Sequence, residues 1–260
     1  GLSKLLNIKE IFIIKTDLTN SLCSDNFEIE NIKIRTVKSN PSRNYIAGNF
    51  FSHYNFLKLQ NPEFPIMRNQ YASSILSKYS LKNKNPKLEL VIHIRSGDIF
   101  RSRSIHKNYG QPPLAFYILC IKDIKPSSIT LVFEDYSNPV IFLLISYINS
   151  INCKLRLNKL NSLKEDVSCI LNAKAIIFGN GTFVPGILLG SKSIKTIYAF
   201  ELKQDFKDIW SLKRIKNIYN VTDEFGLYRK NVLNNNWKAS NYQLKLMKNY
   251  SIDNLKLNIF

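Results

Sequence analysis

Short apolar runs alternate with longer segments of helical spacing from residue 88 to residue 201. The short runs are rich in Ile, Val, Leu and Phe, as in strands that are buried on both faces. Strands are expected at 88–94, 129–134, 153–157, 174–179 and 195–201, and helices at 112–123, 139–151, 163–173 and 183–191. Because single helices separate these strands, the pattern predicts parallel pairing through right-handed crossovers, that is, a doubly wound α/β sheet.

The segments on either side of this region have weaker patterns. Apolar positions predict strands at 11–14 and 27–36 and a helix around 70–79, whereas 203–260 is rich in Lys and Asn and is expected to be helical or irregular. We therefore expect a partial N-terminal α/β lobe (1–85), a Rossmann-like lobe (86–205) and a C-terminal tail (206–260).

Polar loops follow three of the expected strands: HIRSGD (93–98), EDYSN (134–138) and GNGT (179–182). Ligands of open parallel sheets bind at the carboxyl ends of the strands, at the point where the strand order reverses. We therefore expect the three loops to converge at one edge of the sheet and to form a binding site there.

The first loop has the residue types of a phosphate site. Arg95 carries a rigid fork of donors that matches phosphate oxygens, and Gly97 lets the backbone approach a ligand closely. Asp98 can orient Arg95 or cap the segment that follows. Alone, however, the loop could be a structural turn with an Arg–Asp pair, and His93 could be an ordinary core histidine.

The third loop also suits an anion. Asn180, Gly181 and Thr182 offer backbone N–H groups and a hydroxyl, just before an expected helix that begins at Phe183. Alone, Asn-Gly is common in turns, and EDYSNP resembles a helix cap. The order of the three loops on successive strand ends favours the functional interpretation, and two phosphate-adapted loops suggest a diphosphate.

Tyr109 and Gln111 lie in the stretch YGQPP, which follows the first loop closely. They could form part of the wall of the donor or acceptor site, or belong to a turn before a proline-started helix. The sequence leaves both interpretations open.

Charge and cysteine content narrow the class of protein. The net charge of +18 would suit nucleic acid, a membrane surface or a phosphorylated substrate, but the lysines are scattered and no nucleic-acid-binding motif occurs. The four cysteines form no C-x-x-C pair, which fits a reducing compartment. No apolar run reaches the roughly 20 residues of a membrane span, and no signal peptide stands at the start. We expect a cytoplasmic protein that does not bind nucleic acid.

Three stretches together resemble the fucosyltransferases that carry an H-x-R-R-x-D motif. They are VIHIRSGDIF (91–100), LVFEDYSN (131–138) and EDVSCILNAKAIIFGNGTFVPGILLGS (165–191). The chain is most similar to the bacterial α1,2-fucosyltransferases, and more distantly to the α1,6- and protein O-fucosyltransferases, over about residues 88–200. The resemblance implies a GT-B-like architecture of two lobes and inverting transfer from GDP-fucose to a glycan or lipid-linked glycan. It also implies that neither metal nor another cofactor takes part.

The resemblance also implies roles for individual residues. Arg95 would hold the β-phosphate of the donor and supply the charge that a metal provides elsewhere. The remaining donor-binding candidates are Glu134, Asp135, Asp166, Asn180, Gly181, Thr182 and Phe183. Asp98 and His93 are the catalytic candidates beside Arg95, as possible acceptors of the proton from the acceptor hydroxyl, although His93 is expected rather to bind the sugar or brace the loop.

Some positions depart from the family pattern. Ser96 stands where the family has a second arginine, and Val184 and Pro185 stand where tryptophans usually occur. A glycine-rich G-x-G-N turn is not found near the start, so the first strand and its turn are expected to be missing, and the chain could be inactive by itself. The alternatives are a GT-B transferase for another nucleotide sugar and a non-catalytic nucleotide-sugar-binding protein. Peripheral contact with a membrane, or the Golgi lumen in a eukaryote, are the alternatives for location.

Overall fold

The computed structural model divides the chain into two units, residues 1–71 and 72–260. It describes residues 26–29, 32–35, 76, 88–101, 107–159, 162–202, 215–234 and 236–259. In the first unit, strands β1 (Asn26–Ile29) and β2 (Ile32–Arg35) pair antiparallel. The strand region expected at 27–36 is therefore confirmed, as two short strands that pair with each other. The strand expected at 11–14 lies outside the described residues, as does the helix expected around 70–79 except for Leu76, which is helical and buried.

Among the described residues of the second unit, seven strands form one sheet in the order β5-β4-β3-β6-β7-β8-β9. Every neighbouring pair is parallel except β8 and β9. The first six strands follow the 3-2-1-4-5-6 order of a Rossmann-like sheet, which confirms the expected doubly wound α/β class. The strands are β3 (Leu88–His93), β4 (Ser128–Phe133), β5 (Lys154–Lys159), β6 (Ala173–Phe178), β7 (Thr196–Phe200), β8 (Asn217–Asp223) and β9 (Leu255–Ile259).

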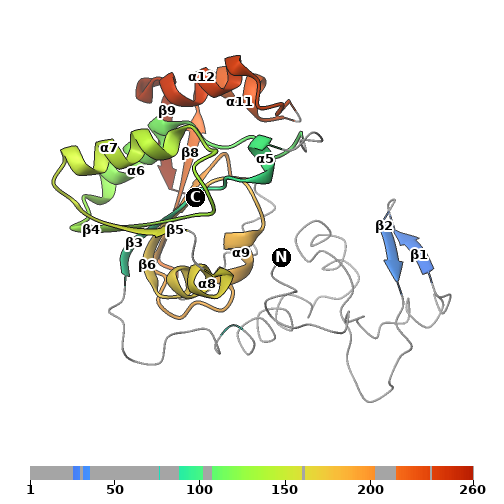
Figure 1. Ribbon diagram of the computed structural model, residues 1–260, viewed down its shortest axis with the longest axis horizontal. Helices are drawn as coiled ribbons and strands as arrows, with labels where there is room; N and C mark the ends of the chain where they lie inside the picture. The colour runs from blue at the N-terminus through green and yellow to red at the C-terminus, as the bar shows by residue number, and fades with distance from the viewer. Residues whose placement is uncertain are drawn as a thin grey trace. The chain divides into compact units, whose positions relative to one another are not determined.

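Helices cover both faces of this sheet (Figure 1). α6 (Leu114–Ile124) and α7 (Val140–Ser150) lie on one face, and α8 (Leu163–Leu171) and α9 (Phe183–Leu188) lie on the other. Pro113 precedes α6 with a φ of −72°, as proline at a helix start favours, and Ser162 and Glu165 form a capping box at the start of α8. The remaining described helices are α5 (Asp98–Arg101), α11 (Leu227–Val232), α12 (Asn241–Asn249) and the 3₁₀ turn η3 (Ile252–Asn254).

The described residues of the 206–260 segment are not a helical or irregular tail, which corrects the expectation from the sequence. They supply β8 and β9 to the sheet and helices α11 and α12 to one face. The sequences of the two strands, NIYNVTD and LKLNI, mix apolar residues with Asn and Lys because β9 is the edge strand, β8 lies next to it, and both are only partly buried. The surrounding Lys and Asn hide this weak alternation.

The C-terminal segment also completes the hydrophobic core on the α6 and α7 face. Trp237 and Tyr228 are among the largest fully buried side chains, and they pack in one cluster with Phe116 and Tyr117 of α6. The indole N–H of Trp237 donates to the carbonyl of Ile99, 2.9 Å away, so the segment also holds α5 in place. Burial of each such side chain stabilises the fold by about 1.5–3 kcal/mol.

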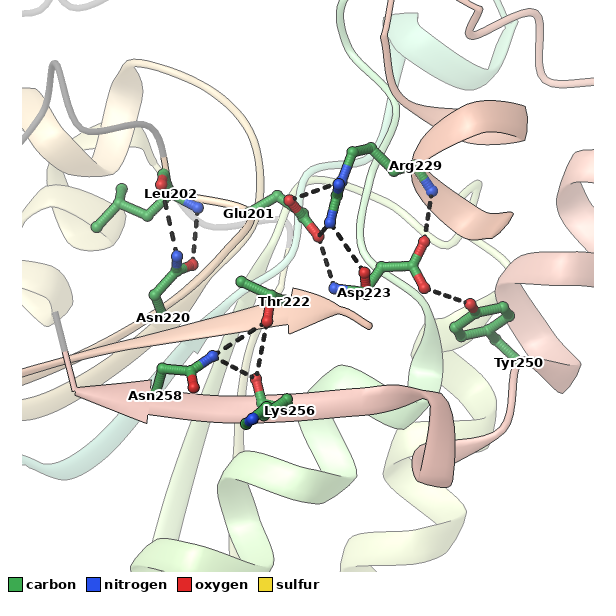
Figure 2. A network of polar contacts seen from close by, with 9 residues as sticks. All are labelled: Glu201, Leu202, Asn220, Thr222, Asp223, Arg229, Tyr250, Lys256 and Asn258. Atoms are coloured by element: carbon green, nitrogen blue, oxygen red, sulfur yellow. Dashed lines mark hydrogen bonds and ion pairs between the residues drawn. The ribbon is translucent and has the colours of Figure 1, made fainter. Parts of the chain in front are cut away.

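A network of polar side chains joins the carboxyl ends of β7 and β8 to α11 (Figure 2). Arg229 donates from Nε and Nη2 to the two carboxylate oxygens of Glu201, each at 3.0 Å. The buried carboxylate of Asp223 accepts from the Tyr250 hydroxyl (2.5 Å) and from the Arg229 backbone N–H (2.9 Å). The hydrogen bonds from Arg229 to Glu201 raise the pKa of the guanidinium. The network therefore fixes α11 against the sheet.

We expect Asp223→Ala to lower the free energy of unfolding by about 2–4 kcal/mol, because it leaves a buried hydroxyl and an N–H group without their acceptor. Tyr250→Phe removes one donor and leaves Asp223 its bond from Arg229, so it should cost only about 1 kcal/mol. Urea denaturation followed by circular dichroism measures both. Equal losses in the two variants would show that Asp223 does not organise the network.

Candidate functional site

The strand order reverses between β3 and β6, and two of the three sequence-predicted loops start at this point. β3 and β6 are hydrogen-bonded neighbours, with His93 directly opposite Phe178 at their ends. The HIRSGD loop follows β3 and the GNGT loop follows β6, so both leave the sheet at its carboxyl edge and side by side. The expectation that these loops share one edge is confirmed, and the edge is the place where Rossmann-like sheets bind ligands.

The loop after β4 joins the same edge and holds the first loop by hydrogen bonds. The Gly97 N–H donates to the hydroxyl of Ser137 (2.7 Å) and to a carboxylate oxygen of Asp135 (3.2 Å). The side-chain amide of Asn138 donates to the carbonyl of Arg95 at 2.9 Å. These contacts span about 40 residues of sequence and fix the backbone of residues 95–97.

Asp135 stabilises the backbone of the first loop rather than forming part of an open ligand site. Its N–H donates to the hydroxyl of Ser96, and its carboxylate makes an ion pair with Arg101 at 3.2 Å. Partial burial would raise the pKa of Asp135, but hydrogen bonds from Ser137 and Gly97 and the charge of Arg101 outweigh it and lower the pKa. Ser96 is buried, so a larger side chain at this position would displace the loop.

Arg95 lies at the start of the loop with its guanidinium half-exposed. Its Nη2 donates to Asp98 at 2.8 Å, and its central carbon lies 5.7 Å from the centroid of the Tyr109 ring. The same Asp98 oxygen accepts the Ile99 N–H, so Asp98 both orients Arg95 and caps α5, as expected. The Nε of Arg95 is buried and has no hydrogen-bond partner in the described part of the chain. A buried donor without a partner costs about 1–3 kcal/mol, which a ligand oxygen would recover.

His93 is half-buried and neutral at pH 7. Its ring lies 5.4 Å from the ring of Phe183, the first residue of α9. Burial lowers the pKa of His93 to about 4, and the charge of Arg95 lowers it further in the same direction. The imidazole therefore adds no positive charge for a phosphate, and it is a weak base.

Gln111 and Tyr109 have different roles, although the sequence left the same two interpretations open for both. The side chain of Gln111 is fully buried, and its Nε2 donates to the carbonyls of Tyr109 (2.9 Å) and Asn180 (3.2 Å). The Tyr228 hydroxyl of α11 donates to the Gln111 carbonyl at 2.6 Å. Gln111 is thus a brace between the YGQPP stretch and the third loop rather than a wall of the site, whereas Tyr109 lies beside Arg95.

The third loop is open. Asn180 and Thr182 are exposed, and Gly181 has a φ of +139° with no atom within 4 Å of the place where a Cβ would stand. α9 is shorter than the expected helix at 183–191, because it ends at Leu188 and a turn follows, and the Thr182 side chain does not cap it. A six-residue helix has only a small dipole. The loop therefore offers backbone N–H groups and a hydroxyl rather than a strong helix field.

Two carboxylates lie near the first loop on the α8 side. A Cβ on Gly97 would come within 2.5 Å of Glu134 Oε2, so the Glu134 side chain lies directly against the loop. Asp166, on α8, accepts from the side-chain amide of Asn158 at 2.7 Å. Burial raises the pKa of Asp166 to about 6 against the effect of this bond, and the negative charges of Glu165 and Glu134 raise it too.

Sequence reasoning missed several residues that hold the site together. The sequence indicates Asn138 only as a possible helix cap, and its Oδ1 does accept the Val140 N–H at 3.1 Å, but its hydrogen bond to the Arg95 carbonyl leaves no local signal. Tyr228 gives no local signal, since it meets Gln111 across 117 residues of sequence.

Among the described residues, no group of three or more His, Cys, Asp or Glu side chains could hold a metal ion. Within the same residues, no helix has the length and apolar character that crossing a bilayer requires. No protein-family model matches the sequence, and a search of curated proteins finds no match. The geometry and charges of the site therefore have to carry the functional argument.

Asp166 predicts how stability depends on pH. Its folded-state pKa of about 6 lies above the unfolded value of 3.8, so the folded protein holds this proton more tightly, and the resulting stabilisation is lost as the pH rises through 6. Asp166→Asn keeps an oxygen for Asn158 and removes the charge. The free energy of unfolding of Asp166→Asn minus that of the wild type should therefore be about 1–2 kcal/mol larger at pH 8 than at pH 4.5.

Urea titrations of both proteins at the two pH values measure this difference. Glu224→Gln, the same acid-to-amide change at an exposed position, is the matched control and should show no such dependence. An Asp166→Asn variant that loses the same stability at both pH values would contradict the prediction.

Proposed function

We propose that this chain carries the nucleotide-sugar-binding lobe of a GT-B glycosyltransferase that transfers fucose from GDP-fucose to a glycan hydroxyl, with inversion and without metal. One observation carries the proposal most directly. Arg95 lies at the switch point of a Rossmann-like sheet with a buried Nε–H that lacks a partner, and the open GNGT loop leaves the neighbouring strand. A diphosphate would give oxygens to both.

Electrostatics support a diphosphate at this edge. His93 is neutral and Asp135 already pairs with Arg101, so the guanidinium of Arg95 is the cation that faces the ligand in the described part of the loop. Asp98 occupies Nη2 and leaves Nε for a phosphate oxygen. A preorganised cation at the departing phosphate stabilises the charge that develops in the transition state, typically by several kcal/mol.

Asp98 is the better of the two candidate bases. Its carboxylate is exposed and can be reached by an acceptor hydroxyl, whereas His93 is half-buried. Because Asp98 also bonds to Arg95, the proton acceptor and the phosphate ligand would be held in fixed relation to each other.

The identity of the sugar and of the acceptor rests on the resemblance to the fucosyltransferases in the three loops. A different nucleotide sugar would use the same Arg95 and GNGT contacts, since these address the diphosphate and not the sugar. A glycan or lipid-linked glycan remains the expected acceptor. A lobe that binds the nucleotide sugar without transferring it would show GDP binding and no release of GDP from GDP-fucose.

We expect Arg95→Lys to weaken GDP binding by at least about 30-fold. Arginine can donate to Asp98 from Nη2 and to a phosphate oxygen from Nε at the same time, whereas the single nitrogen of lysine can keep the ion pair with Asp98 but cannot hold both partners in this geometry. Isothermal titration calorimetry with GDP, in the presence of EDTA, measures the effect. Arg156→Lys, an exposed arginine on β5, is the matched control and should bind GDP like the wild type.

Unchanged GDP affinity in Arg95→Lys would assign Arg95 a structural role. GMP and an RNA of random sequence are tested with the wild type in the same way. GMP should bind more weakly than GDP because it lacks the second phosphate, and RNA that binds as tightly as GDP would refute the proposal in favour of a nucleic-acid-binding protein.

A further inference from the structure

Helix α7 presents large apolar side chains to the solvent. Phe142 and Leu143 are 59% and 40% exposed, and Ile151, at the C-terminal cap of the helix, is 41% exposed. Leu143, the half-buried Tyr147 and Ile151 recur every four residues, so they follow one side of the helix. A surface helix of a globular protein normally turns charged residues towards the solvent, and α7 turns apolar ones there.

The lack of charge extends over the whole segment around α7. Residues 136–153 contain no Asp, Glu, Lys or Arg, although charged residues make up 22% of the chain. The polar residues within α7 itself are only Ser, Tyr and Asn. A contiguous exposed apolar face of this kind marks a surface that contacts another apolar phase or a partner.

The outermost ring on this face has a fixed orientation. The ring of Phe142 stacks on the ring of Tyr136, with centroids 4.6 Å apart and an angle of 12° between the planes. Tyr136 in turn packs edge-on against Phe133, which is buried. Because the column of rings starts in the core, Phe142 is already ordered at the surface and loses little conformational entropy when a partner covers it.

The neighbouring helices surround this apolar face with positive charge. α6, α7 and α12 pack against one another on the same side of the sheet (Figure 1). Lys245 and Lys248 of α12 are exposed, and residues 234–250 contain no Asp or Glu. On α6, the carboxylate of Asp123 accepts the hydroxyl of Tyr198 at 2.5 Å. The charges on α12 beside the apolar face are therefore lysines alone.

An apolar face bordered by lysines matches the surface of an anionic bilayer. Phe and Leu side chains insert below the lipid headgroups, and lysines are attracted to the lipid phosphates. Tyr242 of α12, which is 57% exposed, has the amphipathic ring that favours the headgroup level. Lysine is depleted at protein–protein interfaces but favoured beside anionic lipids, so the composition of this face favours a membrane over a protein partner.

We propose that α7 and α12 form a docking surface for an anionic lipid bilayer, into which Phe142 and Leu143 insert while Lys245 and Lys248 bind lipid phosphates. The inference goes beyond the proposed function and does not depend on it, because binding to vesicles requires no nucleotide. α7 begins directly after the loop that braces residues 95–97, so its Phe142 end lies at the same edge of the sheet as the candidate site.

The test is sedimentation of the protein with vesicles of phosphatidylcholine alone and of an equal mixture with phosphatidylglycerol. The wild type should bind the anionic vesicles at least about 10-fold more tightly than the neutral ones, and high salt should weaken this binding. Because the whole chain has a net charge of +18, variants with matched controls have to show that this particular face is responsible.

Phe142→Gln combined with Leu143→Gln should weaken binding to the anionic vesicles by about 30-fold or more, because two apolar side chains no longer insert. Phe225→Gln combined with Leu227→Gln is the matched control. Phe225 and Leu227 are 73% and 46% exposed, but the exposed Glu224 stands beside them, so this pair should bind like the wild type. Circular dichroism checks that both variants fold.

Lys245→Gln combined with Lys248→Gln should weaken binding to the anionic vesicles by about 10-fold and leave binding to the neutral ones unchanged. Lys174→Gln combined with Lys195→Gln removes the same charge from two exposed lysines at the amino ends of β6 and β7. This second pair should change the affinity by less than about twofold, because these lysines lie outside the docking surface.

Three results would overturn the inference. Equal losses from the two lysine pairs would show that net charge alone drives binding, and equal losses from the two apolar pairs would show that α7 has no special role. A wild type that ignores vesicles, but forms dimers that Phe142→Gln with Leu143→Gln dissociates in analytical ultracentrifugation, would assign the face to a second copy of the chain. GDP binding, and with it the proposed function, is measured separately and stands or falls independently of these results.

Discussion

The parallel pairing of β3 with β4 on one side and β6 on the other is the constraint on which the site depends. Backbone hydrogen bonds in register put His93 beside Val132 and Phe178, so the three polar loops must leave the sheet at one edge. No single loop has to be unusual for this to happen. Because β3 is central and buried on both faces, a one-residue shift of its register would exchange Leu90 and Ile92 with Val91 between the two packed faces, and this penalty keeps the loops aligned.

The site is supported from a distance by the C-terminal segment. Trp237 holds the Ile99 carbonyl beside the first loop, and Tyr228 holds the carbonyl of Gln111, whose side chain bonds to the third loop. The Glu201–Arg229 and Asp223–Tyr250 contacts in turn fix α11, which carries Tyr228. Side chains that never touch a ligand can therefore position those that would, and damage to the edge strands should be felt at the site.

Charge is divided along the edge of the sheet in a way that favours a ligand with both anionic and neutral polar parts. Arg95 contributes the cation near the GNGT loop, while Glu134 and the destabilised carboxylate of Asp166 lie on the α8 side. Carboxylates that repel each other and are partly desolvated cost stability, and such groups concentrate at functional sites. A sugar nucleotide, with its diphosphate and its hydroxyl groups, matches this division.

The sequence by itself determined the doubly wound core from 88 to 201, because strands and helices in this region are apolar enough to show their periods locally. It also indicated that Asp98 could orient Arg95 or cap the segment that follows, since Asp98 lies three residues after Arg95, and the structure shows the pair. Only the tertiary structure decided that residues 217–259 complete the sheet, because edge strands need few apolar side chains and so leave a faint pattern. It alone also separated Glu134 from Asp135 and Gln111 from Tyr109, because these adjacent or nearby polar residues differ only in the partners that distant segments bring to them.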